Sequence, residues 1–446
     1  MSKVIKIKKG KDINLVGVAQ KSTTKVSSPT YAVKPTDFKN FVPKLEVKAG
    51  AEVKAGDVLF HDKTNEAIKF TSPVSGEVAE IVRGDRRAVL EVRILADSEM
   101  KYKSFNIPTT LNAENVKAIL LSSGLWPFII QRPFGIIAHP DATPKSIHIS
   151  CFDSAPLAAD FDYTLANEAD SFAKGVEVLK NLTSGKIHLN VSSKNSKPSF
   201  ISKTQGVEIT EFSGPHPAGL VGVQIHHIDP INKGDVVWTL NPQHVVFIGR
   251  LFATGKVDLR QIIAVAGSDV SKPAYVEVIS GTSLEPVLKG NLSGNNSRII
   301  SGNVLTGTKI SANSHLGFFD NLVTAIPEGD EYEFMGWLLP TYPRPTISNS
   351  LPISKFLKKT FKVNTNYHGE ERAYVVTGQY EKVLPMDILP VYLIKAIMAQ
   401  DLEAMENLGI YEVIEEDLAL CEFVCTSKME VQKILSEGLT IMAEEG

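Results

Sequence analysis

Two cysteines near the C-terminus are the first residues whose types and spacing could do chemistry. Cys421 and Cys425 lie in the stretch LALCEFVCTSK with three residues between them, and the third cysteine, Cys151, lies far upstream. A structural zinc site needs four Cys or His ligands, and an iron–sulfur cluster normally needs four thiolates. Redox CxxC motifs have two residues between the cysteines. The pair therefore cannot close a metal site alone, and the spacing favours two buried thiols.

Three other stretches imitate functional motifs without completing them. Residues 302–309, GNVLTGTK, resemble a phosphate loop, but Thr308 stands between the second glycine and the lysine. Residues 218–222, AGLVG, have two glycines at dinucleotide-loop spacing, but a proline occupies the place of the first glycine of that loop. His226 and His227 are adjacent, so on a strand they would point to opposite faces and would not chelate one ion. We therefore expect no nucleotide or metal site at these positions.

Composition narrows the class of protein. A length of 446 residues suggests about three domains, and a hydrophobic content of 43% with 22% charged residues is typical of globular chains. The net charge of −3 argues against nucleic acid as a partner, and three cysteines favour a reducing compartment. The N-terminal MSKVIKIKKGKD is interrupted by lysines, so it does not resemble a signal peptide. No apolar run approaches 18 residues, so we expect any membrane association to go through a partner.

Residues 1–100 are predicted to form β structure. LEVKAGAEVKAGDVLF and IKFTSPVSGEVAEIVRGDRRAVLEVRIL alternate apolar and polar residues around glycine-bearing turns, a pattern typical of a small barrel or sandwich. VKAGDVL and SPVSGEVAEI resemble the barrel-sandwich hybrid fold of biotinyl and lipoyl carrier domains. Lys63, in the hairpin HDKTNEAIK, stands where a carrier holds its modified lysine, but the flanking methionines are missing. We therefore expect a structural barrel.

Strands and helices alternate through residues 101–260. NAENVKAILLSSGLW predicts a helix capped by Asn112, and NEADSFAKGVEVLKNLTSG predicts a second helix that stops at Gly185. SIHISCF and KIHLNVS read as strands between them. This alternation indicates an α/β unit. The apolar positions expected inside are Val116, Ile119 and Leu120 in the first helix and Val176, Val178, Leu179 and Leu182 in the second.

The rest of the chain changes character twice. Residues 261–330 are rich in β-forming residues and glycine, as in IIAVAGSDVSKPAYVEVISGTSLEPVLKG. Residues 331–446 begin with a proline-rich linker, PTYPRPTISNSLP, and end in helical segments. The sequence thus predicts an α+β multidomain protein.

Several long phrases, in order along the whole chain, resemble one family. VKPTDFKNFVPKLEVKAGAEVKAGDVLFHDK, SGLWPFIIQRPF, FSGPHPAGLVGVQIHHIDP, RIISGNVLTGTK, YEKVLPMDILP and EEDLALCEFVC are similar to the A subunits of the Na⁺-translocating NADH:quinone reductases. That family is related to the C subunit of the Rnf complex and to the flavin subunit of respiratory complex I. The resemblance implies a barrel-sandwich hybrid over 1–100, a Rossmann-like α/β domain over 101–260, an SLBB-like β-grasp domain over 261–330 and a linker with a helical domain over 331–446.

The same resemblance explains the incomplete motifs. Flavin-binding relatives cradle the FMN phosphate with a glycine-rich loop, whereas the matching stretch SGLWPFIIQRPFG keeps Gly124 and then places Trp126 and Pro127. A proline has no N–H to offer an anion, so we expect the fold without the flavin. The Rnf relative ends in two ferredoxin-like cysteine runs, of which CEFVC, followed by Thr426, keeps only the end of one. We interpret this pair as the remnant of a cluster-binding helix.

Function is implied by the resemblance in the same way. It implies a peripheral subunit on the cytoplasmic face of a bacterial six-subunit membrane complex that couples NADH oxidation by quinone to Na⁺ export. The complex uses NADH, flavins and iron–sulfur clusters in other subunits, so no tightly bound cofactor and no metal are expected here. Quinone is the expected substrate, at a site shared with one of the membrane subunits. The head of a quinone needs apolar walls and hydrogen-bond donors to its carbonyls. The candidate walls are Trp126, Phe128 and Phe134, and the candidate donors are Arg132 and His216.

Two other classes of function stay open from the sequence. A stand-alone flavin-dependent NADH dehydrogenase would need the glycine loop that is missing here. An assembly scaffold without a ligand would use the same aromatic residues only for core packing and Arg132 only for an ion pair. The isolated chain is expected to have no NADH dehydrogenase activity in either the quinone-binding or the scaffold interpretation.

Overall fold

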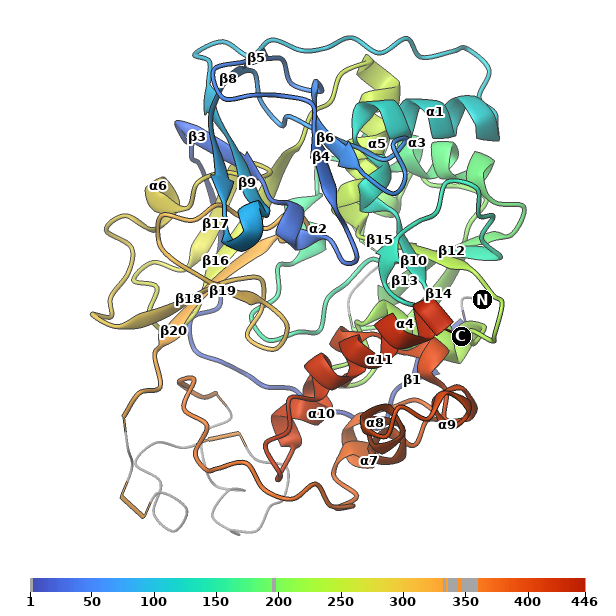
Figure 1. Cartoon of the computed structure of the whole chain (residues 1–446), viewed down its shortest axis with the longest axis vertical. Coiled ribbons are helices and arrows are strands. Elements are labelled where there is room, and N and C mark those ends of the chain that lie inside the picture. The colour runs from blue at the N-terminus through green and yellow to red at the C-terminus, as the bar shows by residue number, and fades with distance from the viewer. Residues whose placement is uncertain (1–2, 195–197, 332–333, 336–343, 346–359, 446) are drawn as a thin grey trace.

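Three sheet-based units and a group of C-terminal helices make up the chain (Figure 1). The computed structural model describes residues 3–194, 198–331, 334–335, 344–345 and 360–445. In Figure 1 the N-terminal barrel lies beside the helices of the α/β unit, the third sheet lies below the barrel, and the C-terminal helices lie under the α/β sheet.

The barrel-sandwich unit consists of two small antiparallel sheets. One has the strand order β3-β9-β8-β5 and the other β4-β6-β7. Phe60 and Phe70 stack in its core with ring centroids 4.9 Å apart, and Phe38 packs on Phe70 from the loop before β4. The elements are β3 (Thr30–Val33), η1 (Pro35–Asp37), β4 (Pro43–Leu45), β5 (Glu52–Val53), β6 (Val58–Asp62), β7 (Lys69–Thr71), β8 (Gly76–Arg83), η2 (Asp85–Arg87) and β9 (Val89–Ala96).

The α/β unit is built on a seven-stranded sheet of order β1-β14-β13-β12-β15-β10-β11. The strands from β1 to β15 are parallel, whereas β10 and β11 form an antiparallel hairpin at one edge. SIHIS and KIHLNVS form adjacent parallel strands, which confirms the two strand predictions. The strands are β1 (Lys3–Lys6), β10 (Ile130–Arg132), β11 (Ile136–Ile137), β12 (Ser146–Ser150), β13 (Lys186–Ser192), β14 (Glu208–Ser213) and β15 (Val237–Leu240).

Helices cover both faces of this sheet, with α1, α3 and α5 on one side and α4 on the other (Figure 1). Asn112 caps α1, since its side chain accepts a hydrogen bond from the Asn115 backbone N–H at 2.9 Å, as predicted. The second predicted helix is shorter than expected because it ends well before Gly185. A Cβ at Gly185 would lie 1.8 Å from the Lys145 carbonyl oxygen, so this glycine serves a close approach of two chain segments. The elements are α1 (Ala113–Ser123), η3 (Trp126–Phe128), α2 (Phe161–Thr164), α3 (Ala169–Leu179), η4 (Lys180–Leu182), η5 (Ser199–Ile201), α4 (Val221–Ile228) and α5 (Pro242–Thr254).

The third unit, expected from the sequence to be an SLBB-like domain, is a six-stranded sheet of order β19-β18-β20-β16-β17-β2. Apolar side chains on one face of the sheet pack against α6 and form a separate small core. Its elements are β2 (Gln20–Lys25), β16 (Arg260–Ala266), β17 (Ala274–Ile279), α6 (Glu285–Leu288), β18 (Ser297–Ser301), β19 (Thr308–Ile310) and β20 (Leu322–Pro327).

The first two strands of the chain belong to sheets built mostly from later residues. β1 pairs in parallel with β14 in the α/β sheet, and β2 pairs in parallel with β17 in the SLBB sheet. The barrel strands begin only at Thr30. Sequence alternation grouped residues 1–100 in one region because it registers strand character and carries no information on the partner strand.

Short helices fill the C-terminal region and pack on the β1 side of the α/β unit (Figure 1). The predicted helical character is confirmed there. The proline-rich linker lies outside the described residues except for residues 344–345. No helix in the described parts of the chain is long and apolar enough to span a bilayer. The elements are α7 (Tyr380–Val383), α8 (Pro390–Met398), α9 (Leu402–Asn407), η7 (Ile410–Glu412), α10 (Glu415–Val424) and α11 (Val431–Glu445).

Candidate functional site

The segment that replaces the flavin loop forms a tight link between α1 and the edge hairpin of the α/β sheet. Helix α1 ends at Gly124, which has a φ of 74°. A Cβ there would lie 2.4 Å from Thr71 Oγ1, and this hydroxyl donates a hydrogen bond to the Ser123 carbonyl oxygen. A turn of 3-10 helix then leads into β10, which pairs antiparallel with β15. The glycine is thus required by close contact with the barrel, which fixes where the hairpin starts.

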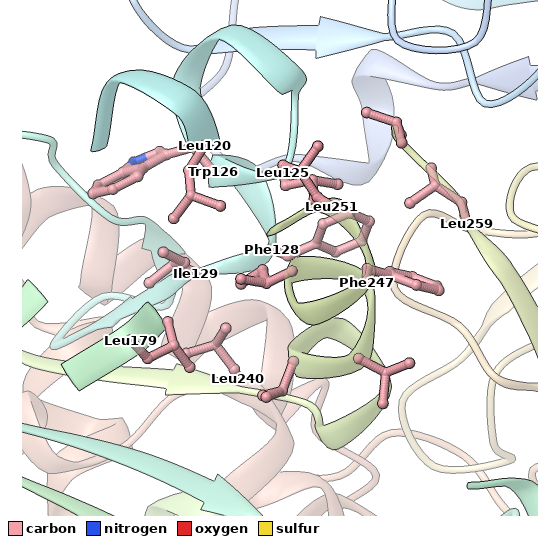
Figure 2. Close-up of a cluster of buried hydrophobic side chains, with 14 of the residues drawn as sticks. Leu120, Leu125, Trp126, Phe128, Ile129, Leu179, Leu240, Phe247, Leu251 and Leu259 are labelled. Carbon is pink, nitrogen blue, oxygen red and sulfur yellow. The ribbon is translucent and has the colours of Figure 1, made fainter. Parts of the chain in front are cut away.

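Trp126 and Phe128, the first two predicted quinone walls, lie in the hydrophobic core. Both side chains are fully buried. The Trp126 indole Nε1 donates to the Ala138 carbonyl oxygen at 2.7 Å, and Phe128 stacks on Phe318 with centroids 4.4 Å apart. Figure 2 shows Trp126 beside Leu120 of α1, and Phe128 beside Leu251 and Phe247 of α5. Their contacts are those of core residues that join three parts of the fold.

Arg132, a predicted donor, lies at the end of β10 and is also buried, with 1% of its surface exposed. Its Nη1 donates to Asp417 Oδ2 at 2.5 Å, and its Nη2 donates to Glu416 Oε1 at 2.7 Å. Asp417 is itself buried and accepts a hydrogen bond from the Ile414 backbone N–H at the start of α10. The guanidinium therefore ties the edge hairpin to the N-terminus of a C-terminal helix.

A glycine in the incomplete dinucleotide motif makes room for this ion pair. A Cβ at Gly222 would lie 2.3 Å from Asp417 Oδ1 and 2.7 Å from Arg132 Nη1. Any side chain there would push α4 away from the pair. The AGLVG stretch thus serves the packing of α4 against these two charges.

Phe134, the third predicted wall, differs from the other two because it is only half-buried. It occupies the hairpin turn with a φ of 81°. Its ring packs edge-to-face with the ring of Tyr411, and the two ring centroids are 6.1 Å apart. It lines a small cavity of about 80 Å³. The other lining residues are Lys39, Asn40, Glu415, Ser436, Leu439 and Thr440.

Lys39 and Glu415 form an ion pair at the mouth of this cavity. Lys39 keeps 38% of its side chain exposed, and Glu415 keeps 17%. Burial acts to raise the pKa of Glu415, but the Lys39 ammonium outweighs that effect and holds the pKa below its usual value. The cavity therefore combines an aromatic wall with a charged lysine that is accessible to a ligand.

His216, the second predicted donor, belongs to a different neighbourhood. It is 2% exposed, and its Nδ1 lies 3.0 Å from Ser154 Oγ. Its backbone N–H donates to Asp12 Oδ1 at 2.8 Å. Burial lowers the pKa of His216 to about 4, so the imidazole is neutral near pH 7. His216 anchors the N-terminal segment to the loop before α4.

The structure therefore brings Arg132 and Phe134 together on one hairpin and leaves the other predicted site residues in separate surroundings. Sequence reasoning missed Lys39, Glu416 and Asp417, which complete this site. The three consecutive acidic residues 415–417 were visible as a charged start to a helix. Their buried arginine partner is about 280 residues away in sequence, so local patterns could not indicate it.

Cys421 and Cys425 are buried and unbridged, at 1% and 3% exposure, which confirms the prediction of buried thiols. Burial raises the pKa of Cys421 far above its usual value. Lys63 is exposed in the turn after β6. Among the described residues, no group of three or more His, Cys, Asp or Glu side chains is placed to hold a metal ion.

The adjacent histidines lie on helix α4 rather than on a strand, which corrects that assumption. His226 Nδ1 contacts Glu412 Oε2 at 2.7 Å, and its Nε2 accepts from the Asp387 backbone N–H. His227 Nε2 lies 2.9 Å from the Pro385 carbonyl oxygen. Both side chains therefore hold the C-terminal region against the α/β unit.

Three family models match successive parts of the chain. Residues 5–97 match the NqrA N-terminal barrel-sandwich hybrid domain, and residues 111–257 match the NqrA second alpha/beta domain. Residues 262–312 match the model described as the NQRA C-terminal domain. The order of these matches follows the order of the three sheet-based units.

Similar proteins cover the full length. The chain is 38% identical to the A subunit of the Na⁺-translocating NADH-quinone reductase of Marinomonas sp. over 99% of this chain and 100% of that protein. It is 37% identical to the same subunit of Serratia proteamaculans and 38% identical to that of Neisseria meningitidis, with the same coverage. Among solved structures, a chain of an NAD⁺-reducing [NiFe]-hydrogenase in the H₂-reduced state aligns with 12% identity and a TM-score of 0.38. The alignment covers 75% of this chain and 62% of the hydrogenase chain. With family models on all three sheet units and full-length identity near 38%, this chain belongs to the family of the A subunits of Na⁺-translocating NADH-quinone reductases.

Proposed function

We propose that this chain is the peripheral A subunit of a Na⁺-translocating NADH:quinone oxidoreductase and contributes to quinone binding and reduction at the β10–β11 hairpin. Its full-length relatives carry the name of that subunit. In this proposal, the chain sits at the cytoplasmic face of the membrane and reaches the bilayer through the other subunits. NADH, flavins and iron–sulfur clusters act in those subunits, and this chain holds no tightly bound cofactor.

The half-exposed ring of Phe134 beside Lys39 is the observation that carries the quinone-binding proposal. The cavity of about 80 Å³ is much smaller than the roughly 300–1,000 Å³ of typical ligand sites. It is therefore one wall of a site, and we infer that the quinone-binding membrane subunit supplies the other. Trp126 and Phe128 support the hairpin from the core, and Arg132 positions it against α10.

The chemistry of the two exposed groups suits a quinone head. A flat ring can stack on or meet the edge of Phe134. The Lys39 ammonium can donate to a carbonyl oxygen, and this hydrogen bond strengthens as electrons make that oxygen more negative. Glu415 pairs with the ammonium and orients it before the quinone arrives. Stabilisation of the reduced ring would therefore come from a preorganised cation.

Substitution of the two exposed groups tests this proposal in the assembled complex. Lys39→Met and Phe134→Ala are each expected to raise the KM for quinone or lower quinone reduction by roughly five- to a hundredfold, the effect of about 1–3 kcal/mol. NADH oxidation by an artificial acceptor should stay at the wild-type rate, because NADH enters elsewhere. Lys44→Met, whose lysine is exposed and outside the cavity, is the matched control. If both activities fell equally, or if neither fell, the result would contradict a quinone site at this hairpin.

A ligand-free assembly scaffold is the second candidate, because Trp126, Phe128 and Arg132 are buried and make their contacts inside the fold. Titration of a short-chain quinone against the complex separates the two functions. Under the scaffold function, the Phe134 and Lys39 variants would bind that quinone as tightly as the wild type while assembling less well.

A further inference from the structure

A groove on the barrel-sandwich unit has no role in the site described above. It has a volume of about 610 Å³ and lies between the segment 35–45 and the β8–β9 hairpin. Its volume falls within the range of roughly 300–1,000 Å³ that is typical of binding sites. Its lining includes Phe38, Phe41, Val42, Arg83, Arg86 and Arg87. We call this feature the arginine groove.

The floor of the arginine groove is apolar and firmly supported. Phe38 is 7% exposed and packs on Phe70 and Phe318 at centroid distances of 4.5 and 4.8 Å. Phe41 packs on the same aromatic cluster but is only half-buried, and Val42 at the rim is 49% exposed. A rigid aromatic floor of this kind suits a large apolar side chain from another molecule.

One rim of the groove carries three exposed arginines. Arg83, Arg86 and Arg87 belong to the β8–β9 hairpin, and Arg83 Nη1 donates to the Arg87 carbonyl oxygen. Within the described parts of the chain, no carboxylate oxygen lies within 4.0 Å of their side-chain nitrogens. By contrast, Arg93 on the adjacent strand is paired with both Glu80 and Glu91. The groove thus concentrates positive charge on a chain whose net charge is −3.

The backbone of the β8–β9 hairpin turn has an unusual conformation at two of these arginines. Arg86 and Arg87 have φ values of 52° and 62°, in the left-handed region that Gly or Asn adopts at lower cost. Hydrogen bonds hold the turn, from the Gly84 N–H to the Ala88 carbonyl oxygen and from Arg83 Nη1 to the Arg87 carbonyl oxygen. The side chains of Arg86 and Arg87 are free of intramolecular ion pairs within the described residues, so they can pair with an anionic partner.

We propose that the arginine groove binds a segment of a partner subunit that carries a large apolar side chain flanked by carboxylates. The apolar side chain would fill the space over Phe38 and Phe41, and the carboxylates would pair with the arginines of the hairpin. Arginine suits this task because its planar guanidinium binds a carboxylate with two parallel hydrogen bonds. The concave floor favours a protein segment over a flat anionic membrane surface. The proposal rests on family membership and does not depend on the quinone site.

The arginine groove lies next to the cavity at Phe134. Lys39 and Asn40 line the cavity at Phe134, whereas Phe38 and Phe41 line the arginine groove. The same short segment 38–41 therefore separates the two features. A partner held in the groove would stand directly beside the Phe134 cavity.

Photo-crosslinking in the assembled complex tests the occupant directly. A photoreactive phenylalanine analogue is placed at Leu45, which lines the groove and is half-buried, and in a second preparation at exposed Lys54 as a control. The expected crosslink from Leu45 alone is to a partner-subunit segment with at least two Asp or Glu residues near a large apolar one. Crosslinks only to lipid, only to this chain, to a segment without acidic residues, or to nothing would overturn the proposal.

Charge variants supply an independent arm. Arg86→Glu with Arg87→Glu should reduce the amount of this chain that copurifies with the membrane subunits by at least about tenfold at moderate salt, equivalent to about 1.4 kcal/mol. Arg86→Lys with Arg87→Lys, which keeps the charge and the same backbone demand, should retain most of the association. Lys48→Glu with Lys54→Glu makes the same charge change at exposed sites outside the groove and should have no effect.

The charge variants can either support or contradict the proposal. Wild-type association of the Arg86/Arg87 charge-reversal variant, or an equal loss in the Lys48/Lys54 control, would contradict the proposal. Flotation with phosphatidylglycerol vesicles identifies the competing source of negative charge. If wild-type chain binds the vesicles and the arginine variant does not, while copurification is unchanged, the groove serves the membrane and not a protein segment.

Discussion

A single buried guanidinium connects two parts of the chain that are about 280 residues apart. Arg132 was expected to face a quinone because its position matched a ligand site in relatives. The structure instead surrounds it with Asp417, Glu416 and the close approach of Gly222. Removal of one partner from a buried ion pair leaves an uncompensated charge, which costs more than the pair itself contributes. At the residue scale, Arg132 joins the β10–β11 hairpin to the start of α10.

Arg132→Met is expected to lower the free energy of unfolding by about 3–5 kcal/mol, because it leaves Asp417 buried without its counter-charge. Chemical denaturation followed by tryptophan fluorescence measures this loss. Arg260→Ala is the matched control, since Arg260 pairs with Asp258 while its side chain is 54% exposed, and it should cost only about 0–1 kcal/mol. A stable Arg132→Met protein with a raised KM for quinone would instead show that Arg132 contacts the substrate.

At the scale of elements, short sequence patterns predicted the features that depend on residues close together in the chain, such as helix caps, buried helix faces and strands. The cap at Asn112, the inward face of α3 and the strands at SIHIS and KIHLNVS follow from side-chain periodicity and capping, and the structure has them. The hairpin of β10 and β11 was missed because its residues were compared with a flavin loop rather than read as strands. The partners of β1 and β2 were out of reach because pairing depends on strands distant in sequence.

Two adjacent strands of the central sheet carry a buried pair of histidines. His148 on β12 and His188 on β13 stack with ring centroids 4.4 Å apart, and their strands pair at these positions. Burial lowers the pKa of His148 well below 6.5, and a proton on His188 would act in the same direction. Burial also lowers the pKa of His188, although Glu208 acts in the opposite direction. Both rings are therefore neutral in the folded protein near pH 7.

This pair predicts a loss of stability in mild acid. The unfolded chain binds protons at these histidines near pH 6.5, whereas the folded chain binds them only at lower pH. Above about pH 6.5, these two histidines should not reduce the free energy of unfolding. Below that pH, the free energy of unfolding should fall by up to about 1.4 kcal/mol per pH unit for each histidine. Unfolding measured from pH 7.5 to 5 should show a shallower slope in the His148→Gln, His188→Gln variant. His139→Gln, at an exposed position, should keep the wild-type slope. An unchanged slope in the double variant would contradict the assignment.

At the scale of the whole molecule, polar contacts join the barrel to the SLBB domain. Glu91 of the barrel pairs with His315 of the SLBB domain, and Asp37 accepts a hydrogen bond from the Phe318 backbone N–H. Burial raises the pKa of Asp37 to about 6, and the nearby Lys34 opposes that rise. These contacts hold the barrel against the sheet of residues 260–327.

The purified chain is therefore expected to contain no stoichiometric flavin, iron or zinc. The two C-terminal thiols are buried in an apolar core, and the end of α1 is occupied by Thr71 and Trp126. Visible absorption and elemental analysis after gel filtration measure this content. One flavin or one metal ion per chain that survives gel filtration would show that a cofactor site has been overlooked.

The pairing of β1 and β2 with distant strands bears on how the protein is made. These strands are synthesised before their partners, β14 and β17, which end at residues 213 and 279. At roughly 5–20 residues per second, synthesis leaves β1 and β2 without these partners for on the order of ten seconds to a minute. Lysines at positions 3, 6, 8, 9 and 11 keep the segment around β1 charged, which discourages pairing with other nascent chains. Each of the two strands can therefore join its sheet only after the residues of its partner strand have been made.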